Sequence, residues 1–425
     1  MSGKKFKVIT LGCRTNQYES QAYTDQLQAL GYVRAEESES VDLCIVNTCT
    51  VTDAADSSSR QTIRQITRQN PNAQVIVTGC AAEKNAKVFE EIPGVLKVVS
   101  NKEKENLLPL VFPEESWPEF AISHFEAHTR AFVKVQDGCN SFCTYCIIPY
   151  VRGRSRSRRL SDILKEVETL VETGFKEIVL TGINIGDFDG NPKEGESPLR
   201  LSDLVRAVDQ IQGVERLRIS SIDPDEVDED LMDAVLNGRS TCPSFHIVLQ
   251  SGSNVVLKRM NRKYTSQMFL EAIDKMRRAR LDFTFTTDVI VGFPGESDAD
   301  FEDTLEIMRK VRFAKVHMFP YSKREKTRAA LYPNQVSADV LQKRKRKVLE
   351  LAEEVGFCLR QDYVGKQVKV LLESKDKESG LFSGHTENFL PVFVEGEGLK
   401  QNQIVSVKLI ENGPQGLKGV FCENS

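Results

Sequence analysis

The chain has 425 residues, of which 40% are hydrophobic and 28% are charged, and its formal net charge is −4. A chain of this length is expected to form about three domains of roughly 150 residues each. No run approaches the roughly 18 uninterrupted apolar residues of a membrane span, and the basic start leads into a strand pattern without a secretory cleavage site. We therefore expect a cytoplasmic protein with no membrane partner and no global attraction to nucleic acid.

From residue 7 to about residue 112, short apolar runs alternate with longer stretches that carry apolar residues at helical spacing. The apolar runs are KVITLG (7–12), LCIVN (43–47) and QVIVTG (74–79). Strands that alternate with helices predict a parallel sheet covered by helices. We therefore predict an α/β domain over residues 1–112, followed by a linker rich in proline, acidic and aromatic residues over 113–128.

The alternation resumes at residue 131 and continues through six further candidate strands. These are AFVKVQ (131–136), EIVLTG (177–182), RLRISS (216–221), FHIVLQ (245–250), FTFTTDVIVGF (283–293) and KVHMFPYS (315–322). Six strand–helix units predict a partial TIM-like (β/α)6 barrel, whose active site is expected at the C-terminal ends of the strands. We assign residues 129–362 to this domain, including a charged helix at its end.

Residues 363–425 form the third predicted domain. The segments VKVLLE, LFSGHTENFLPVFVEG and QIVSVKLIEN have strand patterns and are separated by glycine and asparagine turns. This pattern predicts a small all-β barrel of the oligonucleotide-binding kind.

The stretch DGCNSFCTYC (137–146) directly follows the first barrel strand and contains Cys139, Cys143 and Cys146. Cytoplasmic thiols serve as metal ligands or reactive groups more often than as disulfide partners. Zinc is usually closed by four ligands, and no cysteine or histidine lies between Cys146 and Cys242. Three thiolates fit a cubane iron–sulfur cluster with one iron open to a substrate or cofactor. The alternatives are a zinc knuckle and a disulfide with a spare cysteine.

Three cysteines of the N-terminal domain repeat this pattern. Cys13, Cys49 and Cys80 follow apolar strands in TLGC, VNTC and VTGC. Parallel strands place their C-terminal ends at one edge of the sheet, so we expect these thiols to converge there and hold a second cluster. The alternative is that small apolar cysteines simply pack at strand ends, which we accept for Cys44.

The three-cysteine spacing, with Tyr145 before the last cysteine, resembles the radical SAM signature. Two incompletely ligated clusters, the first in a flavodoxin-like sheet and the second in a radical SAM barrel, resemble the methylthiotransferase family over nearly the whole chain. Residues 365–421 resemble the TRAM domain, a small β-barrel that binds RNA. The segments LGCRTNQYES, NTCTVTDAADSSSRQTIR, LQSGSNVVLKRMNRKYT and TDVIVGFPGE are most similar to the branch that modifies threonylcarbamoyladenosine in tRNA.

This resemblance implies an enzyme that adds a methylthio group to carbon 2 of N(6)-L-threonylcarbamoyladenosine next to the anticodon of tRNA. It implies two molecules of S-adenosyl-L-methionine (SAM) per turnover, one as methyl donor and one cleaved to a 5′-deoxyadenosyl radical. It also implies two [4Fe-4S] clusters, or roughly eight irons per chain. The implied partners are tRNA, an electron donor such as flavodoxin or ferredoxin, and a sulfur source.

The resemblance also assigns site residues. The implied metal ligands are Cys13, Cys49, Cys80, Cys139, Cys143 and Cys146. The implied SAM contacts are Tyr145 and Ile290 beside the adenine, Thr181 and Gly182 near the methionine amine, and Ser221 near the ribose. No acid or base is assigned, because the sequence does not distinguish a catalytic carboxylate from a helix cap at Asp223 or Asp288. Lys326 departs from the family pattern, in which glycine is common at this position.

Arginine is concentrated in two stretches near the cysteine motif, YVRGRSRSRRL (150–160) and KRMNRKY (258–264). Arginine suits bidentate contacts to phosphate, and Tyr264 offers a stacking surface for a base. The predicted RNA contacts are Arg152, Arg154, Arg156, Arg158, Arg259 and Arg262. The alternative for such runs is a solvated charged surface.

Other functions remain open from the sequence. Within the same family, the target could be isopentenyl-adenosine in tRNA or an aspartate of a ribosomal protein. A different class is a non-catalytic iron–sulfur protein that binds RNA, for which fully ligated clusters would be expected. The two sets of three cysteines argue against that class.

Overall fold

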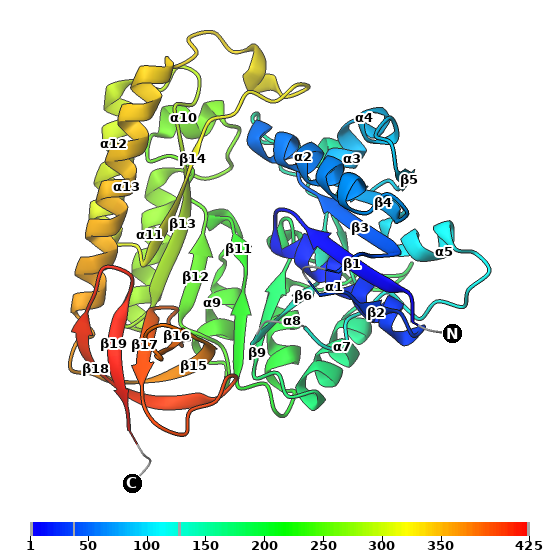
Figure 1. The fold of residues 1–425 in the computed structure, drawn as a ribbon. Coiled ribbons are helices and arrows are strands. Elements are labelled where there is room, and N and C mark those ends of the chain that lie inside the picture. The colour runs from blue at the N-terminus through cyan, green and yellow to red at the C-terminus, as the bar shows by residue number, and fades with distance from the viewer. Residues whose placement is uncertain (1–2, 37–38, 126–128, 423–425) are drawn as a thin grey trace.

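The computed structural model describes residues 3–36, 39–125 and 129–422, and within them the chain forms a parallel sheet, a partial barrel and a closed β-barrel (Figure 1). The N-terminal sheet and the C-terminal barrel both lie against the central partial barrel. The predicted α/β fold class and the all-β C-terminal barrel are confirmed. No helix in the described residues combines the length and the hydropathy that a membrane span requires.

The N-terminal sheet has the parallel strand order β2-β1-β3-β4-β5. Its strands are β1 (Lys5–Thr10), β2 (Val33–Arg34), β3 (Leu43–Thr48), β4 (Gln74–Gly79) and β5 (Val95–Val98). Its helices are α1 (Arg14–Ala29), α2 (Asp53–Gln69), α3 (Cys80–Lys84), α4 (Ala86–Glu90) and α5 (Leu107–Val111), with a 3-10 turn at Lys104–Asn106.

The inner strands β3 and β4 are buried on both faces, which agrees with their apolar sequences. Cys44 and Val46 point to the side of α2, in one core with Ile63. Leu43 and Ile45 point to the opposite side, in a second core with Tyr23 of α1. The buried position of Cys44 confirms that it is a core residue.

The central part contains two parallel sheets, β10-β9-β6 and β11-β12-β13-β14, joined by a bridge between Leu217 and Thr241. Its strands are β6 (Arg130–Lys134), β9 (Glu177–Thr181), β10 (Arg216–Ile219), β11 (Ser221–Ile222), β12 (Ser244–Ile247), β13 (Thr284–Val291) and β14 (Lys315–Pro320), with a short pair of β7 (Gln136–Asp137) and β8 (Arg156–Ser157). Among the described residues no pairing joins β14 back to β6, so the barrel is open on one side.

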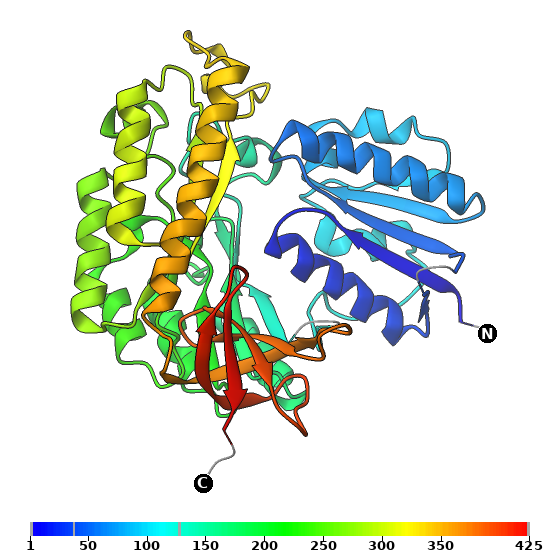
Figure 2. The same cartoon turned by 60° about the vertical axis from the view of Figure 1, so that its left-hand side comes forward.

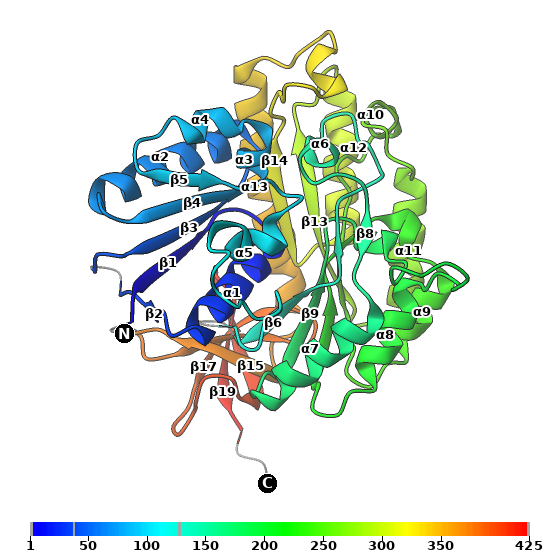
Figure 3. The same cartoon turned by 90° about the vertical axis from the view of Figure 1, so that its right-hand side faces the viewer.

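Helices cover the outside of this barrel (Figures 2 and 3). They are α7 (Leu160–Glu172), α8 (Leu201–Asp209), α9 (Glu229–Leu236), α10 (Asn254–Arg259), α11 (Ser266–Ala279), α12 (Asp298–Val311) and α13 (Ala338–Gln361), with 3-10 turns at Ile185–Asp187, Pro224–Glu226 and Arg328–Leu331. The short helix α6 (Ile148–Val151) instead packs against α3 of the N-terminal domain. The N-terminal sheet lies across the open side, where α1 packs on β6. The largest core cluster fills the space between the strands and this helical layer.

The C-terminal strands form a closed barrel in the order β15-β16-β17-β19-β18. They are β15 (Gln367–Lys375), β16 (Phe382–Thr386), β17 (Pro391–Glu395), β18 (Ile404–Asn412) and β19 (Leu417–Phe421). The guanidinium of Arg218 donates to the carbonyls of Thr386 and Glu387 at 2.9 and 2.7 Å. The turn 386–389 is thereby held against the N-terminal ends of the central strands.

Candidate functional site

Three thiols lie at the C-terminal ends of neighbouring strands of the N-terminal sheet. Cys13 caps α1 after β1, Cys49 follows β3, and Cys80 begins α3 directly after β4. Gly12, with φ of 97°, approaches Cys49 so closely that a Cβ on Gly12 would lie 2.6 Å from the Cys49 Sγ. The loop before Cys13 therefore needs a glycine to bring the first two thiols together.

The surroundings of these thiols are protected from water. Burial raises the pKa of the Cys49 thiol to about 11 and also raises the pKa of Cys80, and the neighbouring thiols of the set add to both shifts. Cys13 is exposed, so the set opens to solvent on one side. A buried thiol ionises more readily when a metal binds the thiolate, and this environment suits ligands of a cluster.

The second set of thiols lies in the loop after β7. This loop is fixed by backbone contacts of Thr144, whose N–H donates to the carbonyl of Met260 at 2.9 Å and whose carbonyl accepts from the N–H of Ala329 at 2.8 Å. Burial and the Cys143 thiol raise the pKa of Cys146 to about 12, and burial raises the pKa of Cys139 as well.

Arg262 adjoins this second set. Its Nη1 donates to the Sγ of Cys143 at 3.0 Å, and its Nη2 forms an ion pair with Asp223. A guanidinium beside a thiolate offsets the negative charge that a thiolate-bound cluster carries. The three thiols and this cation together fit a [4Fe-4S] cluster.

Neither set fits a single metal ion. In the described residues, no three His, Cys, Asp or Glu side chains converge as the ligands of one ion would. The expectation that three thiols meet at one point is therefore too strict, because a cubane binds each thiolate to a different iron and is wider than one ion. The zinc alternative, which requires convergence on one ion, loses support.

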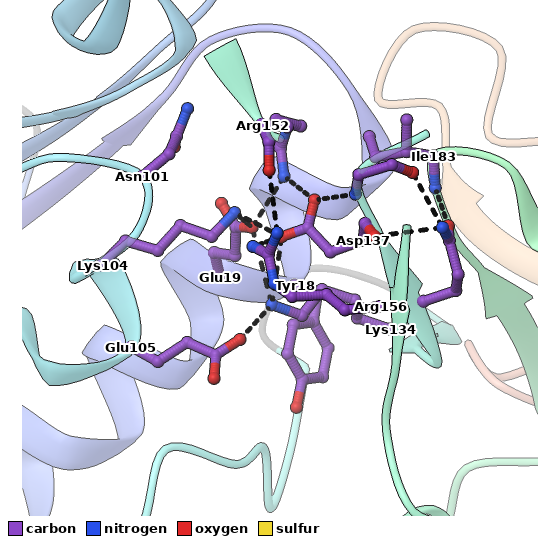
Figure 4. A network of polar contacts seen from close by, with 12 residues as sticks. Tyr18, Glu19, Asn101, Lys104, Glu105, Lys134, Asp137, Arg152, Arg156 and Ile183 are labelled. Atoms are coloured by element: carbon purple, nitrogen blue, oxygen red, sulfur yellow. Dashed lines mark hydrogen bonds and ion pairs between the residues drawn. The ribbon is translucent and has the colours of Figure 1, made fainter. Parts of the chain in front are cut away.

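A buried ionic network connects the two sets (Figure 4). Arg152 follows the second set in sequence, yet its Nε donates to the Sγ of Cys80 at 3.3 Å. Its Nη1 donates to Glu19 at 3.1 Å and to Asp137 at 2.9 Å. One side chain of the central barrel therefore contacts a thiol of the N-terminal sheet and the β7 strand that leads to Cys139.

This network places cations beside Cys80. Among the described residues it contains four cations and three carboxylates: Lys104, Lys134, Arg152, Arg156, Glu19, Glu105 and Asp137. Although burial raises it, the cations Lys104 and Arg152 hold the pKa of Glu19 at about 2. Arg152 and Lys104 likewise oppose the effect of burial on the pKa of Cys80, so they would stabilise the thiolate form that a metal ligand requires.

A pocket lies between the two domains and the C-terminal barrel. Arg14 of α1, Phe132 of β6 and His246 of β12 line it together with Phe389 of the turn 386–389. It lies inside the barrel, below the strand ends that carry the second thiol set. Its link to the thiol sets is Arg14, the residue that follows Cys13.

The residues expected to contact SAM fall into two groups. Tyr145 and Ile290 share one apolar cluster with Phe293, whose ring lies 6.4 Å from that of Tyr145. Gly182 lies against Gln136, where a Cβ would come within 2.9 Å of the Gln136 Oε1. Thr181 is buried beside it. Ser221 is exposed and pairs in register with His246, which places both on one face of the sheet.

Two of the predicted RNA contacts, Arg152 and Arg262, have buried side chains with partners inside the protein. Arg152 is 3% exposed and its guanidinium is fully engaged in the network. Arg262 is 6% exposed at its side chain and pairs with Asp223 and Cys143, and Tyr264 is buried with its hydroxyl on the carbonyl of Leu249. Of these arginines, Arg156 lies in the short strand β8, whereas Arg152 directly follows α6 and Arg259 ends α10.

Of the other predicted RNA-binding arginines, two are paired within the protein and two are exposed. Arg158 is bound to Glu166 at 2.6 Å, and Arg259 donates to the carbonyl of Gly295 at 3.2 Å. Arg154 and Arg156 are exposed, and Arg154 lies over the ring of Phe142. RNA contact stays a prediction for the exposed pair.

Sequence reasoning missed two features. Arg60, Arg64 and Arg68 recur every four residues along one face of α2 and border an open groove there, a spacing that SSRQTIRQITRQ already contains. Arg324 crosses from the loop after β14 to the N-terminal domain, where its Nη2 contacts Thr50 next to Cys49 and pairs with Asp56 at 2.8 Å. No local pattern could reveal a partner so distant in sequence.

The backbone conformation at Lys326 explains why glycine is common at this position in the family. Its φ is 69°, in the left-handed region that glycine adopts without strain. This is why glycine is common at the position, and the cost of lysine is of the order of 1 kcal/mol.

Comparison with known proteins agrees with this geometry. The model of the radical SAM superfamily matches residues 133–308, and that of the uncharacterized protein family UPF0004 matches residues 5–100. The protein of Chlamydia pneumoniae named threonylcarbamoyladenosine tRNA methylthiotransferase MtaB is 49% identical over 417 residues, which are 97% of this chain and 97% of that protein. The chain belongs to the radical SAM methylthiotransferase family.

Two further similarities locate this methylthiotransferase within a wider group. A tRNA-2-methylthio-N(6)-dimethylallyladenosine synthase of Caldicellulosiruptor saccharolyticus is 34% identical, covering 98% of this chain and 92% of that protein. The solved structure of the radical S-adenosylmethionine methyltransferase TsrM of Kitasatospora setae, with cobalamin and a [4Fe-4S] cluster bound, aligns with a TM-score of 0.57 at 14% identity over 78% of this chain and 77% of that chain. The latter supports the fold alone.

The methylthiotransferase also holds a buried carboxyl near the second thiol set. The Nδ2 of Asn184 donates to Glu226 at 2.9 Å, and Gly186 leaves the space that this carboxyl occupies. Burial, reinforced by Asp223, raises the pKa of Glu226 to about 8. Between pH 4.5 and 8 the folded state therefore binds a proton that the unfolded state releases, and stability falls as the pH rises through this window.

The Glu226→Gln variant is therefore expected to gain stability over the wild type, and this gain should be larger at pH 8 than at pH 5. We expect the difference in melting temperature to grow by about 2 °C or more between these values. Thermal unfolding of the metal-free protein at both pH values measures it. Glu229→Gln, an exposed control, should show the same difference at both, and a pH-independent effect of Glu226→Gln would contradict the assignment.

Proposed function

We propose that this chain adds a methylthio group to carbon 2 of N(6)-L-threonylcarbamoyladenosine next to the anticodon of tRNA. The observation that carries the proposal is the presence of two three-thiol sets, one at the strand ends of the N-terminal sheet and one in the loop after β7, with Arg152 contacting both Cys80 and Asp137. The substrate follows from the identity of 49% with a protein named for this reaction, against 34% for one named for dimethylallyladenosine.

The proposed cofactors are two [4Fe-4S] clusters and SAM. The barrel thiols Cys139, Cys143 and Cys146 would hold one cluster, and Cys13, Cys49 and Cys80 the other. These groups supply the radical that removes the hydrogen from carbon 2 and the sulfur that replaces it. Tyr145, Ile290, Thr181, Gly182 and Ser221 would orient SAM at the barrel mouth.

The protein side chains have a separate task. The apolar cluster around Tyr145 excludes water from the barrel mouth. The Arg152 network fixes the N-terminal thiols relative to the barrel thiols, because it is buried and paired at every carboxylate. A fixed separation matters because the reacting carbon must reach both sites.

We propose that tRNA binds across the barrel mouth and α2. Arg154 and Arg156, close in sequence to the second thiol set, and Arg64 and Arg68 on α2 are exposed cations of the two domains. Arginine side chains in such positions neutralise phosphates, and each contact contributes to the salt dependence of binding. The closed C-terminal barrel would add a further RNA surface, as its resemblance to the TRAM domain implies.

The double variant Arg64→Gln/Arg68→Gln is expected to weaken tRNA binding about 3- to 30-fold at moderate salt and to reduce the slope of log affinity against log salt by up to about two. Fluorescence anisotropy with labelled tRNA at several salt concentrations measures both. Lys275→Gln/Arg278→Gln on α11 removes the same charge from the outer face of the barrel. Equal losses in both double variants would contradict a specific RNA surface on α2.

The proposed enzyme has three domains, external donors of electrons and sulfur, and a cytoplasmic location. We propose functional domains at residues 1–112, 129–362 and 363–425 joined by the linker 113–128, of which residues 1–2, 37–38, 126–128 and 423–425 lie outside the described part. Flavodoxin or ferredoxin would supply electrons, and a separate donor would supply sulfur. A cytoplasmic location follows from the tRNA substrate.

The reaction of the purified protein tests the proposal. Protein with reconstituted clusters is incubated with SAM, a reductant, a sulfide source and tRNA that carries threonylcarbamoyladenosine. We expect the methylthio nucleoside by mass spectrometry, together with 5′-deoxyadenosine. Isopentenyl-adenosine tRNA is the control for the second candidate, which the identity of 34% with the dimethylallyladenosine synthase favours. Product from that control alone would overturn the substrate assignment.

A further inference from the structure

We propose that the pocket lined by Arg14, Phe132 and Phe389 binds the carboxylate of the threonylcarbamoyl group, with Arg14 as the recognising side chain. The inference rests on the proposed function, which places that modified adenosine in the site. In this proposal, Arg14 is the residue by which the enzyme distinguishes threonylcarbamoyladenosine from a modified adenosine without charge.

The position of the pocket suits the threonylcarbamoyl group of the substrate. Arg14 is the residue after Cys13, and consecutive Cα atoms are about 3.8 Å apart, so one end of the pocket adjoins the N-terminal thiol set. Its volume of about 30 Å³ exceeds the roughly 10–15 Å³ that an ordered water needs. This space admits a small polar head group.

Arg14 is the cation of this pocket that lacks an anionic partner. Arg130 pairs with Glu373 at 3.3 Å, and Arg218 pairs with Glu177 at 2.6 Å. Arg14 lies over the ring of Phe132 at 5.5 Å, and no carboxylate of the described residues forms an ion pair with it. The charges of the other two arginines are neutralised within the protein, whereas that of Arg14 faces the pocket.

The electrostatic environment agrees with this interpretation. Burial among the surrounding elements, followed by the repulsion of Arg130 and Arg218, lowers the pKa of Arg14 to about 10, while Glu177 and Asp288 oppose this shift. By surface area Arg14 is nevertheless exposed, so an incoming ligand can reach it. An anion that binds here relieves the repulsion among three guanidinium groups.

The chemistry of the ligand matches the walls. A threonyl carboxylate can accept two parallel hydrogen bonds from one guanidinium. The apolar surface of Phe132 and Phe389 suits a methyl group, and Thr286, whose hydroxyl contacts His246 at 2.9 Å, offers a polar group for a hydroxyl. An isopentenyl group has no charge, and it would leave the guanidinium without a partner.

Binding of anticodon stem-loops to the reconstituted protein, without reductant, tests the proposal. Three labelled RNAs carry threonylcarbamoyladenosine, unmodified adenosine or isopentenyl-adenosine at the same position. The measured quantity is the ratio of affinities for the first and second RNA within one preparation. Arg14→Gln is expected to lower this ratio about 10- to 100-fold, the loss of a charge-assisted hydrogen-bond pair, with little effect on unmodified RNA.

Two further variants complete the design. Arg14→Lys keeps the charge and should retain part of the ratio, whereas Arg278→Gln on the outer helix α11 should leave it unchanged. A ratio that Arg14→Gln does not alter, or equal weakening of all three RNAs, would overturn the proposal. Failure of the wild-type enzyme to modify threonylcarbamoyladenosine tRNA would instead refute the proposed function. The turnover assay with the wild-type enzyme therefore distinguishes a wrong function from a wrong role for Arg14.

Discussion

Alanine at Cys13, Cys49 and Cys80 is expected to leave roughly four irons per chain and to abolish the methylthio product while SAM cleavage continues. The barrel thiols are a separate set, in a loop held by Thr144, Met260 and Ala329. They do not depend on the N-terminal thiols for their position. The radical would still form, but no sulfur would be in place to replace the hydrogen.

The complementary variant should behave in the opposite way. Alanine at Cys139, Cys143 and Cys146 is expected to keep roughly four irons and to lose both 5′-deoxyadenosine and product. Iron analysis, 5′-deoxyadenosine measurement and nucleoside mass spectrometry on both triple variants provide the comparison. The exposed Cys358 serves as the control, since Cys358→Ala should keep roughly eight irons. Full iron content in either triple variant would show that its thiols bind no cluster.

Arg152→Gln is expected to destabilise the protein by about 3–5 kcal/mol, because it removes a buried cation from two buried carboxylates. Glu19 is 0% and Asp137 is 4% exposed at the side chain, so water cannot replace the lost partner. The variant also removes the hydrogen bond to Cys80. We therefore expect a changed electron paramagnetic resonance spectrum of the N-terminal cluster in addition to the lower stability.

Arg156→Gln is the matched control for this prediction. Arg156 contacts the same Asp137 at 2.9 Å, but its side chain is 46% exposed. Its loss should cost no more than about 1 kcal/mol and should leave the spectrum unchanged. Denaturant unfolding of the metal-free variants provides the two stabilities. If the two variants lose equal stability, the network around Arg152 does not connect the domains as described.

The strands and the cysteine positions could be predicted from the sequence because each depends on a local pattern. Apolar runs mark β1, β3 and β4, and the cysteine after each run falls at the same sheet edge once the strands are parallel. The adjacency of these three strands is what turns three distant thiols into one set. The three-cysteine loop after β7 was likewise visible from its spacing.

The role of Arg152 could not be predicted, because its partners are distant in sequence. Glu19 lies 133 residues away and Cys80 lies 72 residues away. A run of arginines indicates a solvated or RNA-binding surface, and only the packing of α1 on β6 reveals that one member is buried. The pocket at Arg14 has the same origin, since three separate parts of the chain meet there.

The central claim is that the two thiol sets act together on threonylcarbamoyladenosine in tRNA. Nucleoside analysis of tRNA from a strain that lacks the gene, with and without the wild-type gene restored, tests it most directly. We expect threonylcarbamoyladenosine to lose its methylthio group in the deletion strain and to regain it with the wild-type gene, but not with either triple-cysteine variant. Methylthio-threonylcarbamoyladenosine that persists in the deletion strain would contradict the account.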